Sequence, residues 1–346
     1  MLYLTTLFDK NYLSRALVLY ESLLEQQIEF TLYTLCLDDF SFQHFAQKKY
    51  ESIVPLHINE LENADKELAL AKLNRYKVEY FFTLSPCLPL YLLNKYNLPH
   101  ICSLDADIMF FYSPEKLFSY LQSYSIVITP HKFSPELTHL EEYGKYNVSF
   151  QIFKNDTWGK MCLEKWRIQC IEWCHDYLDE QKQRFGDQKY LDSWTTDYPG
   201  KVKVLTDPVS GLATWNMNNY SISKKDGAYY SNGDKIVFYH YHAFKLLGNR
   251  WASNGFRVFK VHPQKLLVEM YHLYWKKLKA KNNLLNFTTD KSARQNLEDS
   301  TLRKIVTYEG VFYYLSESTL LMMNLTFLQG TLNKLASLKN KLKKLI

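Results

Sequence analysis

The stretch PHICSLDADIMFFYSP, Pro99–Pro114, decides the fold expected for this chain. Its two acids, Asp105 and Asp107, stand one residue apart, directly after one apolar run and directly before another. A buried strand excludes unpaired carboxylates because burying a charge is costly. The stretch is therefore expected to contain one strand that ends at the two acids, and it raises the question of what neutralises them.

Strands and helices alternate along the chain on both sides of this stretch. Further strands are predicted at Leu2–Phe8, Phe30–Asp39, Ser52–Ile58, Ser125–Pro130, Val148–Asp156, Lys201–Leu205 and Lys235–His242. Helices are predicted at Ser14–Gln27, Lys66–Leu93, Ser113–Gln122, Thr157–Gln181 and Gly186–Lys201. This alternation favours an α/β fold with a mostly parallel sheet flanked by helices. Ligands in such sheets bind beyond the carboxyl ends of the strands.

Composition and charge narrow the class of protein. The 346 residues are 47% hydrophobic and 16% aromatic, enough for a large core. We expect a domain at residues 1–260 and a helical C-terminal region at residues 261–346. The net charge of +6 suits anionic partners, but the basic residues are spread out and no nucleic-acid motif occurs, so nucleic acid is not expected. With no signal peptide, no long apolar run and six cysteines read as reduced thiols, a cytoplasmic location is expected.

A basic amphipathic helix is predicted at Thr331–Ile346, where leucines line one stripe and lysines occupy the rest. Such a helix can lie on an anionic membrane surface. It could equally pack on its own domain or form a short coiled coil. The first alternative would make the protein peripheral on the inner face of the membrane.

The aspartate pair has the chemistry of a cation site. Two carboxylates at i and i+2 on a strand point the same way, and they repel each other unless one takes up a proton. A hard divalent cation such as Mn²⁺ or Mg²⁺ removes this repulsion because it prefers oxygen ligands. It also leaves coordination positions for phosphate oxygens. The plainer alternative is an exposed strand end with solvated acids.

A second pair of side chains could complete such a site. The segment KIVFYHYHAFK, Lys235–Lys245, places His240 and His242 one residue apart after an apolar strand. Neutral imidazole is a common metal ligand, although a single buried histidine is more often structural. The two pairs together predict an O,O,N ligand set.

Segments that occur in order along residues 2–250 resemble the GT-A glycosyltransferases, especially the retaining family-8 type of bacteria. They are TTLFDKNYLSRALVLYESLLE, LDADIMFFYSP, YNVSFQIFKND, GDQKYLDSW and FYHYHAFKLLGNRW. They are similar to the family's nucleotide-binding opening, its LDxD metal motif, its FNxGxxxxN strand, its DQxxLN segment and its His-x-x-Gly-x-x-Lys block. The resemblance implies a GT-A (nucleotide-diphospho-sugar transferase) fold.

The resemblance also implies roles for the matching residues. Asp105, Asp107 and His240 would bind the metal, while His242 would contact phosphate or be the ligand itself. Lys245 would neutralise the β-phosphate of the leaving diphosphate. The other implied contacts are Thr5, Thr6, Asn11 and Tyr12 with the nucleotide, and Asp187 and Gln188 with the anomeric carbon and the acceptor. The segment Pro208–Tyr220 would shape the acceptor side, and Trp194, Trp215 and Trp251 are candidates for stacking on a sugar or base.

The sequence departs from the family pattern in several places. The segment EYFFT, Glu79–Thr83, lacks the arginine that usually follows its tyrosine, and Arg75 or Lys72 could substitute. Ala243 replaces the usual glycine, and the usual Pro-Trp after Lys245 is missing. These departures leave the subfamily, the nucleotide and the sugar open.

The implied function is metal-dependent transfer of a sugar to a glycan or lipid-linked acceptor in surface polysaccharide synthesis. The donor would be a nucleotide-diphosphate sugar, with a UDP-sugar the first choice. One alternative is a hydrolase or nucleotidyltransferase that uses the same acids on a diphosphate. Another is a non-catalytic module that docks to a membrane or a partner through Thr331–Ile346, and such a module would bind no nucleotide sugar.

Overall fold

A computed structural model describes residues 1–246, 252–285, 305–308, 311–316 and 319–320 of the chain. The predicted amphipathic helix at Thr331–Ile346 lies outside the described residues, as does Trp251. Within the described part, no helix combines the length and apolar character that crossing a bilayer requires.

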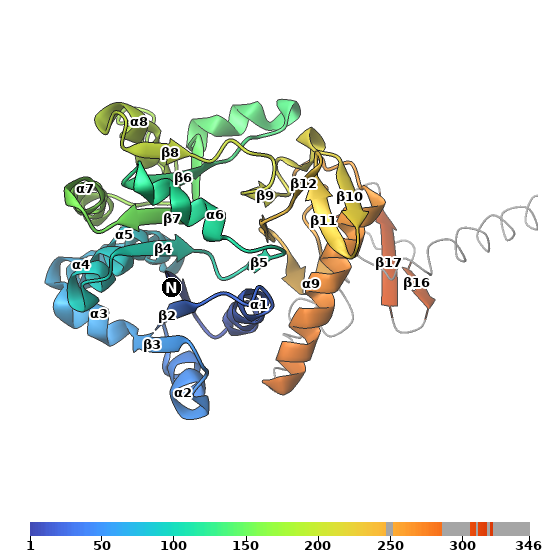
Figure 1. Cartoon of the computed structure of the whole chain (residues 1–346), viewed down its shortest axis with the longest axis horizontal. Helices are drawn as coiled ribbons and strands as arrows, with labels where there is room; N and C mark the ends of the chain where they lie inside the picture. The colour runs from blue at the N-terminus through green and yellow to red at the C-terminus, as the bar shows by residue number, and fades with distance from the viewer. Residues whose placement is uncertain (247–251, 286–304, 309–310, 317–318, 321–346) are drawn as a thin grey trace, which may run out of the picture.

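A seven-stranded sheet forms the centre of the molecule (Figure 1), and its strand order is β3-β2-β1-β4-β7-β6-β8. The strands are β1 (Leu2–Phe8), β2 (Phe30–Cys36), β3 (Ile53–His57), β4 (His100–Leu104), β6 (Ile126–Pro130), β7 (Tyr146–Lys154) and β8 (Val202–Val204). Strands β3, β2, β1 and β4 run parallel, and β8 runs parallel to β6. Only β7 runs against its neighbours β4 and β6. The expectation of a mostly parallel sheet is therefore confirmed.

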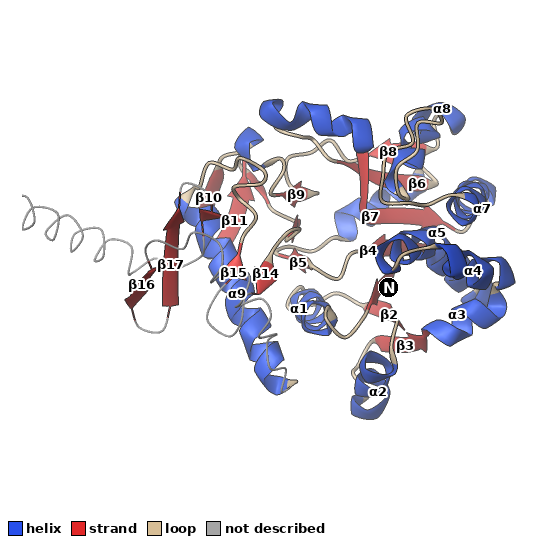
Figure 2. Cartoon of the chain, turned by 180° about the vertical axis from the view of Figure 1, so that it is seen from behind, coloured by secondary structure: helices blue, strands red, loops and turns tan. Residues whose placement is uncertain are grey.

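Helices cover both faces of this sheet (Figures 1 and 2), which explains why most residues of its strands are apolar and buried. The α-helices are α1 (Leu13–Leu24), α2 (Asp39–Lys48), α3 (Ile58–Ala64), α4 (Lys66–Ala71), α5 (Lys77–Tyr96), α6 (Glu115–Ser119), α7 (Thr157–Glu172), α8 (Trp194–Asp197) and α9 (Lys265–Leu284). Short 3₁₀ helices are η1 (Lys72–Asn74), η2 (Tyr120–Gln122), η3 (Pro135–Tyr143), η4 (Gln188–Ser193) and η5 (Met217–Asn219). Helices α5 and α7 share a core with one face of the sheet, and α1 and α6 share a core with the other.

A smaller sheet of order β5-β13-β9 adjoins the first and completes the site. Its strands are β5 (Ile108–Phe110), β13 (Phe238–His240) and β9 (Leu212–Ala213). Helix α9 packs on this sheet in a core of its own, and α1 lies between α9 and the central sheet (Figures 1 and 2). The remaining strands are β10 (Ile222–Lys225), β11 (Ala228–Ser231), β12 (Asp234–Lys235), β14 (Lys245–Leu246), β15 (Ala252–Ser253), β16 (Ile305–Tyr308), β17 (Val311–Ser316) and β18 (Thr319–Leu320).

Two expectations about the strands are wrong. Pro99–Pro114 contains two strands, because β4 belongs to the central sheet and β5 to the smaller one. The region from residue 261 onward is not simply helical, since β16, β17 and β18 follow α9. Isoleucine, valine, tyrosine and phenylalanine are concentrated at residues 305–315, and these residue types favour strands.

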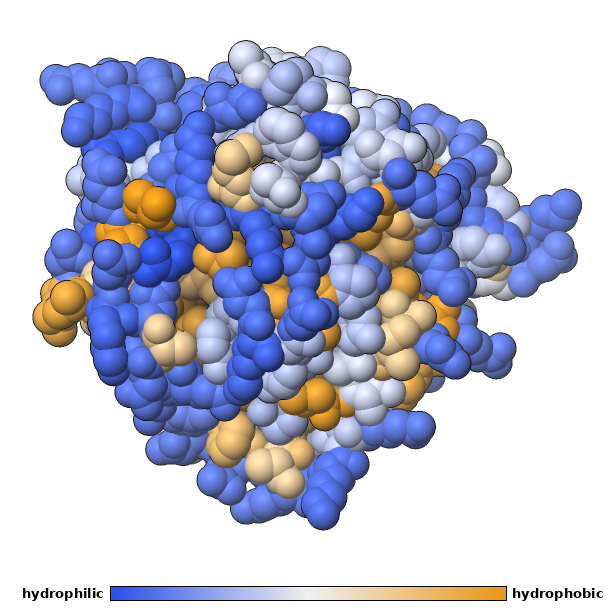
Figure 3. Space-filling view, turned by 60° about the vertical axis from the view of Figure 1, so that its left-hand side comes forward, coloured by the Kyte–Doolittle hydropathy of each residue, from blue (hydrophilic) through white to orange (hydrophobic). Residues whose placement is uncertain are grey.

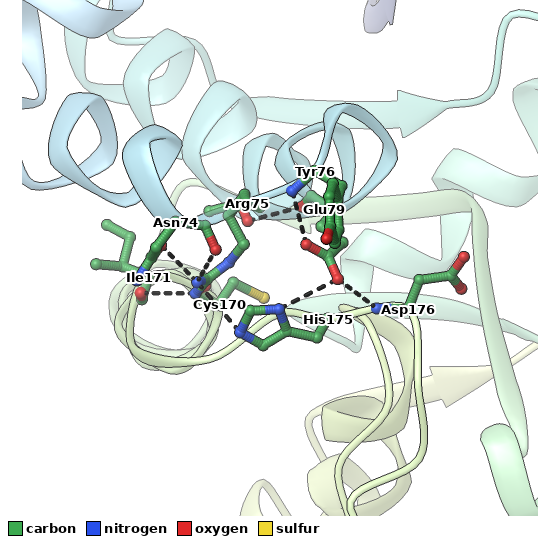
Figure 4. Close-up of polar contacts among 9 residues, drawn as sticks. Asn74, Arg75, Tyr76, Glu79, Cys170, Ile171, His175 and Asp176 are labelled. Atoms are coloured by element: carbon green, nitrogen blue, oxygen red, sulfur yellow. Dashed lines mark hydrogen bonds and ion pairs between the residues drawn. The ribbon is translucent and has the colours of Figure 1, made fainter.

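The predicted helices at Lys66–Leu93 and Thr157–Gln181 are also wrong in extent. The first is broken between α4 and α5 by residues 72–76, and α7 ends at Glu172. Arg75 accounts for both ends, because its guanidinium donates to the carbonyl oxygens of Cys170 (3.3 Å) and Ile171 (3.1 Å) (Figure 4). These carbonyls lie in the last turn of α7, where a helix leaves its acceptors unsatisfied.

A testable consequence concerns Gly159 in the first turn of α7. A Cβ at this position would lie 2.1 Å from the carbonyl oxygen of Lys154, so the helix and the end of β7 could not keep their spacing. We expect Gly159→Ala to lower the free energy of unfolding by about 1–3 kcal/mol, measured by urea denaturation. Met161→Ala, on the exposed side of the same helix, is the control and should change it little. Equal stability of the two variants would contradict this packing.

Candidate active site

The acidic turn Asp105-Ala106-Asp107 connects β4 to β5. The Asp105 amide donates to the Ser149 carbonyl of β7 (3.0 Å), and the Ile108 amide donates back to the Asp105 carbonyl (3.3 Å). The spacing of the two acids had suggested that both lie on one strand. They lie instead in a turn between the two sheets. The turn follows β4 at its carboxyl end, where a parallel sheet places its ligands.

His240 reaches this turn through the smaller sheet. Strand β13 pairs antiparallel with β5, and this register sets His240 opposite Ile108. The amide of Tyr241 also donates to the Asp107 carbonyl (3.0 Å). As a result His240 Nε2 lies 3.1 Å from Asp107 Oδ1 and 3.4 Å from Asp105 Oδ2. One ligand atom from each of the three residues lies within 4.8 Å of the other two.

The protonation states in this cluster depend on one another. Burial alone would lower the pKa of His240, but the charges of Asp107 and Asp105 outweigh burial and raise it. Burial raises the pKa of Asp105, against the opposing charge of His240. Burial acts the same way on Asp107, but there the contact with His240 prevails and lowers the pKa. The contact with His240 therefore opposes the mutual repulsion of the two carboxylates.

The donor set fits a hard divalent cation. Two carboxylate oxygens and one imidazole nitrogen already converge, and the Asp105 side chain remains 43% exposed, which leaves one side open for further ligands. The His240 ring is held by edge-to-face packing on Trp215, with the ring centroids 5.3 Å apart. Asp105, Asp107 and His240 thus converge as the predicted O,O,N set.

A cavity of about 420 Å³ opens beside the cluster. This volume lies within the range of small-ligand sites. The predicted residues on its wall are Asp105, Asp187, Gln188, Trp215, His240 and His242. Much of the remaining wall is aromatic, with Phe82, Phe133, Phe185 and Phe259 among its residues. The structure thus brings together side chains from four distant parts of the sequence.

Among the described residues, Asp187 is the one buried carboxyl of this cavity outside the cluster. Its side chain is buried and its Oδ2 has no hydrogen-bond partner, while its main-chain carbonyl accepts from Trp166 Nε1 (2.9 Å). Burial raises the pKa of Asp187 to about 7, opposed by a hydrogen bond from Ser85. Gln188 is more constrained, because its Nε2 donates to the Tyr143 carbonyl (3.0 Å).

His242 and Lys245 follow the end of β13. His242 reaches the solvent at the cavity wall, yet the surrounding protein atoms and then the positive charge of His240 lower its pKa, with Lys245 adding to the effect. Its imidazole is therefore neutral at pH 7. Lys245 begins β14 and is exposed. It does not line the cavity, but its charge acts on His242.

The residues expected at the nucleotide fall into two groups. Thr5 and Thr6 are buried within β1, and the Thr5 hydroxyl donates to the Tyr33 carbonyl (3.1 Å). Neither threonine lines the cavity. Asn11 and Tyr12 follow β1 at its carboxyl end, and the Tyr12 side chain is 42% exposed. Burial is the main cause of the raised pKa of Tyr12, and the charges of the two acids of the turn add to it, so Tyr12 lies within their electrostatic reach.

Two buried residues that sequence reasoning missed organise the site. Arg15 of α1 donates to the Asn11 carbonyl (3.2 Å) and to the Phe244 carbonyl (2.9 Å), so it joins the end of β1 to the segment after His242. The carbonyl of His131 accepts from Trp215 Nε1 (2.9 Å), which fixes that ring on the cavity wall. Nothing in the local sequence distinguishes Arg15 or His131, because their partners are far away along the chain.

The other candidates named from the sequence have different surroundings. Trp194 is buried in the core against Trp166, with the ring centroids 5.3 Å apart, and does not line the cavity. Arg75 donates to the end of α7, and Lys72 pairs with Glu62 at the surface, so neither takes the place of the missing arginine in this structure.

No family model matches this chain. The chain is 29% identical over 245 residues to the uncharacterized protein YfnD of Bacillus subtilis (strain 168), which covers 70% of this chain and 78% of that protein. It is 29% identical over 252 residues to the uncharacterized protein YfnF of the same organism. That alignment covers 70% of this chain and 81% of YfnF.

Solved structures of glycosyltransferases resemble this structure only at low TM-scores and low sequence identity. Mouse xyloside xylosyltransferase 1 has a TM-score of 0.45 at 14% identity, over 69% of this chain and 97% of that one. The galactosyltransferase LgtC, solved with donor and acceptor sugar analogs, has a TM-score of 0.42 at 14% identity, over 61% and 75%. The glycosyltransferase GlyE of Streptococcus pneumoniae TIGR4 has a TM-score of 0.45 at 11% identity, over 83% and 65%. At these TM-scores the likeness says nothing about the chemistry of this chain.

The raised pKa of Asp187 predicts a pH-dependent cost of folding. Folding raises the pKa of this carboxyl from 3.8 to about 7, so the folded state loses stability relative to the unfolded state as pH increases between these values. A pKa that differs by one between the folded and unfolded states changes the free energy of unfolding by about 1.4 kcal/mol. Asp187→Asn removes the ionisation, so its stability relative to the unchanged protein should increase from about pH 5 to about pH 8. Urea denaturation at both pH values measures this difference.

Asp226→Asn is the matched control, because Asp226 is exposed in the turn between β10 and β11. Its stability relative to the unchanged protein should be the same at both pH values. If Asp187→Asn behaved like this control, the Asp187 carboxyl would not be held in an environment that disfavours its charge.

Proposed function

We propose that this chain is a GT-A glycosyltransferase that moves a sugar from a nucleotide-diphosphate sugar to a glycan or lipid-linked acceptor. The observation that carries the proposal is the Asp105–Asp107–His240 cluster, which opens directly on the aromatic-walled cavity. A diphosphate held at the cluster would leave its sugar within that cavity. Aromatic rings there can pack on the apolar faces of a sugar, and Asp187 lines the same cavity.

Mn²⁺ or Mg²⁺ would be held by Asp105, Asp107 and His240. When bound, the cation would stabilise negative charge on the leaving diphosphate as a Lewis acid. The convergence of two carboxylates and an imidazole supports this assignment, since the three groups need a positive charge between them.

Two side chains after β13 would assist departure of the diphosphate. Lys245 would bring a positive charge to the β-phosphate, and its electrostatic effect on His242 indicates that it lies on the same side of the site. Neutral His242 would present a ring N–H to a phosphate oxygen. Donors placed in advance where charge develops stabilise a transition state without reorganisation.

On the opposite wall, Asp187 would be the polar group at the anomeric carbon, with Gln188 beside it. Its carboxylate would stabilise positive charge that develops on the sugar, and we assign the retaining outcome by resemblance to family 8. Asn11 and Tyr12 would form the nucleotide side, with Thr5 and Thr6 behind them in β1. The catalytic domain would span residues 1–260, with residues 261–346 as the C-terminal region.

The biological setting is part of the proposal. A UDP-sugar would be the donor, and the product would be a surface polysaccharide or its lipid-linked precursor. The protein would work in the cytoplasm, on the inner face of the membrane. The resemblance of residues 2–250 to bacterial family-8 enzymes and the basic segment Thr331–Ile346 support this setting.

Donor binding tests the proposal first. Calorimetry with UDP-, GDP- and CMP-sugars, each with and without Mn²⁺, should reveal one donor whose binding requires the metal. Asp107→Ala should lose that metal-dependent binding, because it removes one of the three ligands. Asp207→Ala, outside the cavity lining, serves as the control and should keep it.

Binding of no donor under any condition would remove the proposed function and leave a docking module. Chromatography of the products separates transfer from hydrolysis. Release of free sugar that an acceptor never diminishes would identify a nucleotide-sugar hydrolase instead.

Lys245→Met tests the leaving-group assignment once the donor is known. Loss of its charge should lower kcat for donor turnover by about 10²–10³-fold, with a smaller change in KM, because the charge acts mainly as the diphosphate leaves. Lys225→Met, an exposed lysine of β10, is the matched control and should leave both constants unchanged. An unchanged kcat in Lys245→Met would refute the assignment.

A further inference from the structure

Two carboxyls outside the metal cluster line the candidate active-site cavity. Asp187 is buried in the cavity wall, whereas Asp176 is exposed. The main chain at Asp176 is fixed, because its amide donates to Glu79 Oε1 (3.2 Å), which His175 Nδ1 also contacts (3.1 Å) (Figure 4). Figure 4 shows the Asp176 carboxylate directed away from these contacts. The two side chains therefore add carboxyl groups to the cavity beyond those of the Asp105–Asp107–His240 cluster.

The neighbouring charges that act on these two acids are negative. Burial raises the pKa of Asp187 to about 7; a hydrogen bond from Ser85 opposes this rise, and the charge of Asp105 adds to it. Burial also raises the pKa of Asp176, and there the charge of Glu79 adds to the rise. Each acid thus lies within the electrostatic range of another carboxylate. A further negative charge brought into the cavity would therefore be unfavourable.

Asp65 shows the opposite situation in another part of the molecule. This carboxyl caps α4, and Arg167 Nε of α7 donates to its Oδ2 (2.7 Å). Burial alone would raise the pKa of Asp65, but the contacts with Arg167 prevail and lower it. Figure 3 brings forward the side of the molecule that carries α4 and α7, where hydrophilic residues predominate. The chain thus neutralises this acid with its own arginine, whereas the charges that act on the two cavity acids are carboxylates.

The chemistry of the two acids favours one class of sugar over another. A carboxylate accepts hydrogen bonds, and a sugar hydroxyl can donate them. A carboxylate or phosphate on the sugar would instead bring a like charge into the same cavity. Because the cavity measures only about 420 Å³, such a group could not lie far from the wall that carries Asp187. Repulsion between like charges is stronger at a partly buried site than in bulk water.

We propose that the cavity selects an uncharged sugar that carries hydroxyls, and that Asp176 and Asp187 exclude sugars with a carboxylate or a phosphate. This inference rests on the proposed function, because it takes the sugar of a nucleotide-diphosphate donor as the ligand. Sugar hydroxyls would donate to the two carboxyls, and the aromatic wall would pack on the apolar faces of the ring. The negative charge of the donor would be confined to its diphosphate, which the cation at the cluster compensates.

Matched pairs of donors test this selection. UDP-glucose and UDP-glucuronate differ only at C6, which carries a hydroxyl in the first and a carboxylate in the second, and UDP-galactose with UDP-galacturonate forms another such pair. Calorimetry in the presence of Mn²⁺ measures each affinity, with UDP alone as the reference for the part of the donor without its sugar. Each uronate should bind the unchanged protein about tenfold or more weakly than its uncharged partner, because it adds a like charge to the cavity. GDP-mannose and GDP-mannuronate replace these pairs if the donor screen selects GDP.

Variants that keep size and remove charge assign the selection to the two acids. Asp176→Asn with Asp187→Asn should narrow the difference between uronate and uncharged donor about tenfold, mainly through tighter binding of the uronate. Asp226→Asn with Asp234→Asn removes the same charge from two exposed positions near β11 and should leave the difference unchanged. Asp176→Asn alone should narrow the difference several-fold, and its exposed side chain makes a folding defect an improbable cause. The affinity for UDP alone reports whether the cluster is intact in each variant.

Three results would overturn the inference, and they are distinguishable. A uronate that binds the unchanged protein as tightly as its uncharged partner would refute the selection while leaving the proposed function intact. A difference that persists in full in Asp176→Asn with Asp187→Asn would assign the exclusion to the shape of the cavity and not to these two charges. Binding of none of the donors, nor of UDP or GDP alone, would refute the proposed function and the inference with it.

Discussion

The electrostatic balance between Asp105, Asp107 and His240 is the constraint on which the arrangement of this protein depends. Two carboxylates this close together, one of them buried, repel each other unless a positive charge lies between them. The imidazole of His240 reaches the two carboxylates because β13 pairs with β5 in the smaller sheet, and β5 directly follows the acidic turn. The smaller sheet and α9 behind it therefore have a direct role, since they hold the imidazole, which the central sheet does not provide.

Helix α1 connects two segments that border the Asp105–Asp107–His240 cluster. This helix lies between the central sheet and α9, and its Arg15 is buried. The guanidinium donates to the main-chain carbonyl of Phe244, two residues after His242, while it also holds the loop that follows β1. One buried arginine thus fixes the distance between the end of β1 and the end of β13. Arg15 consequently connects the nucleotide side and the leaving-group side of the proposed site.

The sequence predicted these features unequally. Strand β1 was predicted with its true bounds, because seven apolar or β-forming residues followed by a polar turn leave little choice. The convergence of Asp105, Asp107 and His240 was predicted as well, since each chemical type stands out at the end of an apolar run. The change of sheet between β4 and β5 was not predicted, because a hydrophobic run does not say which strand it pairs with. Arg15 and His131 were missed for a related reason, as their partners lie 229 and 84 positions away.

The break between α4 and α5 shows how one long-range contact can determine both a fold boundary and a surface. A continuous helix from Lys66 to Leu93 would satisfy local preference, but Arg75 would then lose the carbonyls of Cys170 and Ile171. Satisfying these acceptors ends one helix, starts the next and turns Leu73 and Tyr76 outward. Glu79 transmits the same fixed geometry to the segment that carries Asp176 and leads to Asp187. The polar network around Glu79 therefore connects this turn to the segment that leads to Asp187, where the Gly186 amide donates to the His175 carbonyl (3.0 Å).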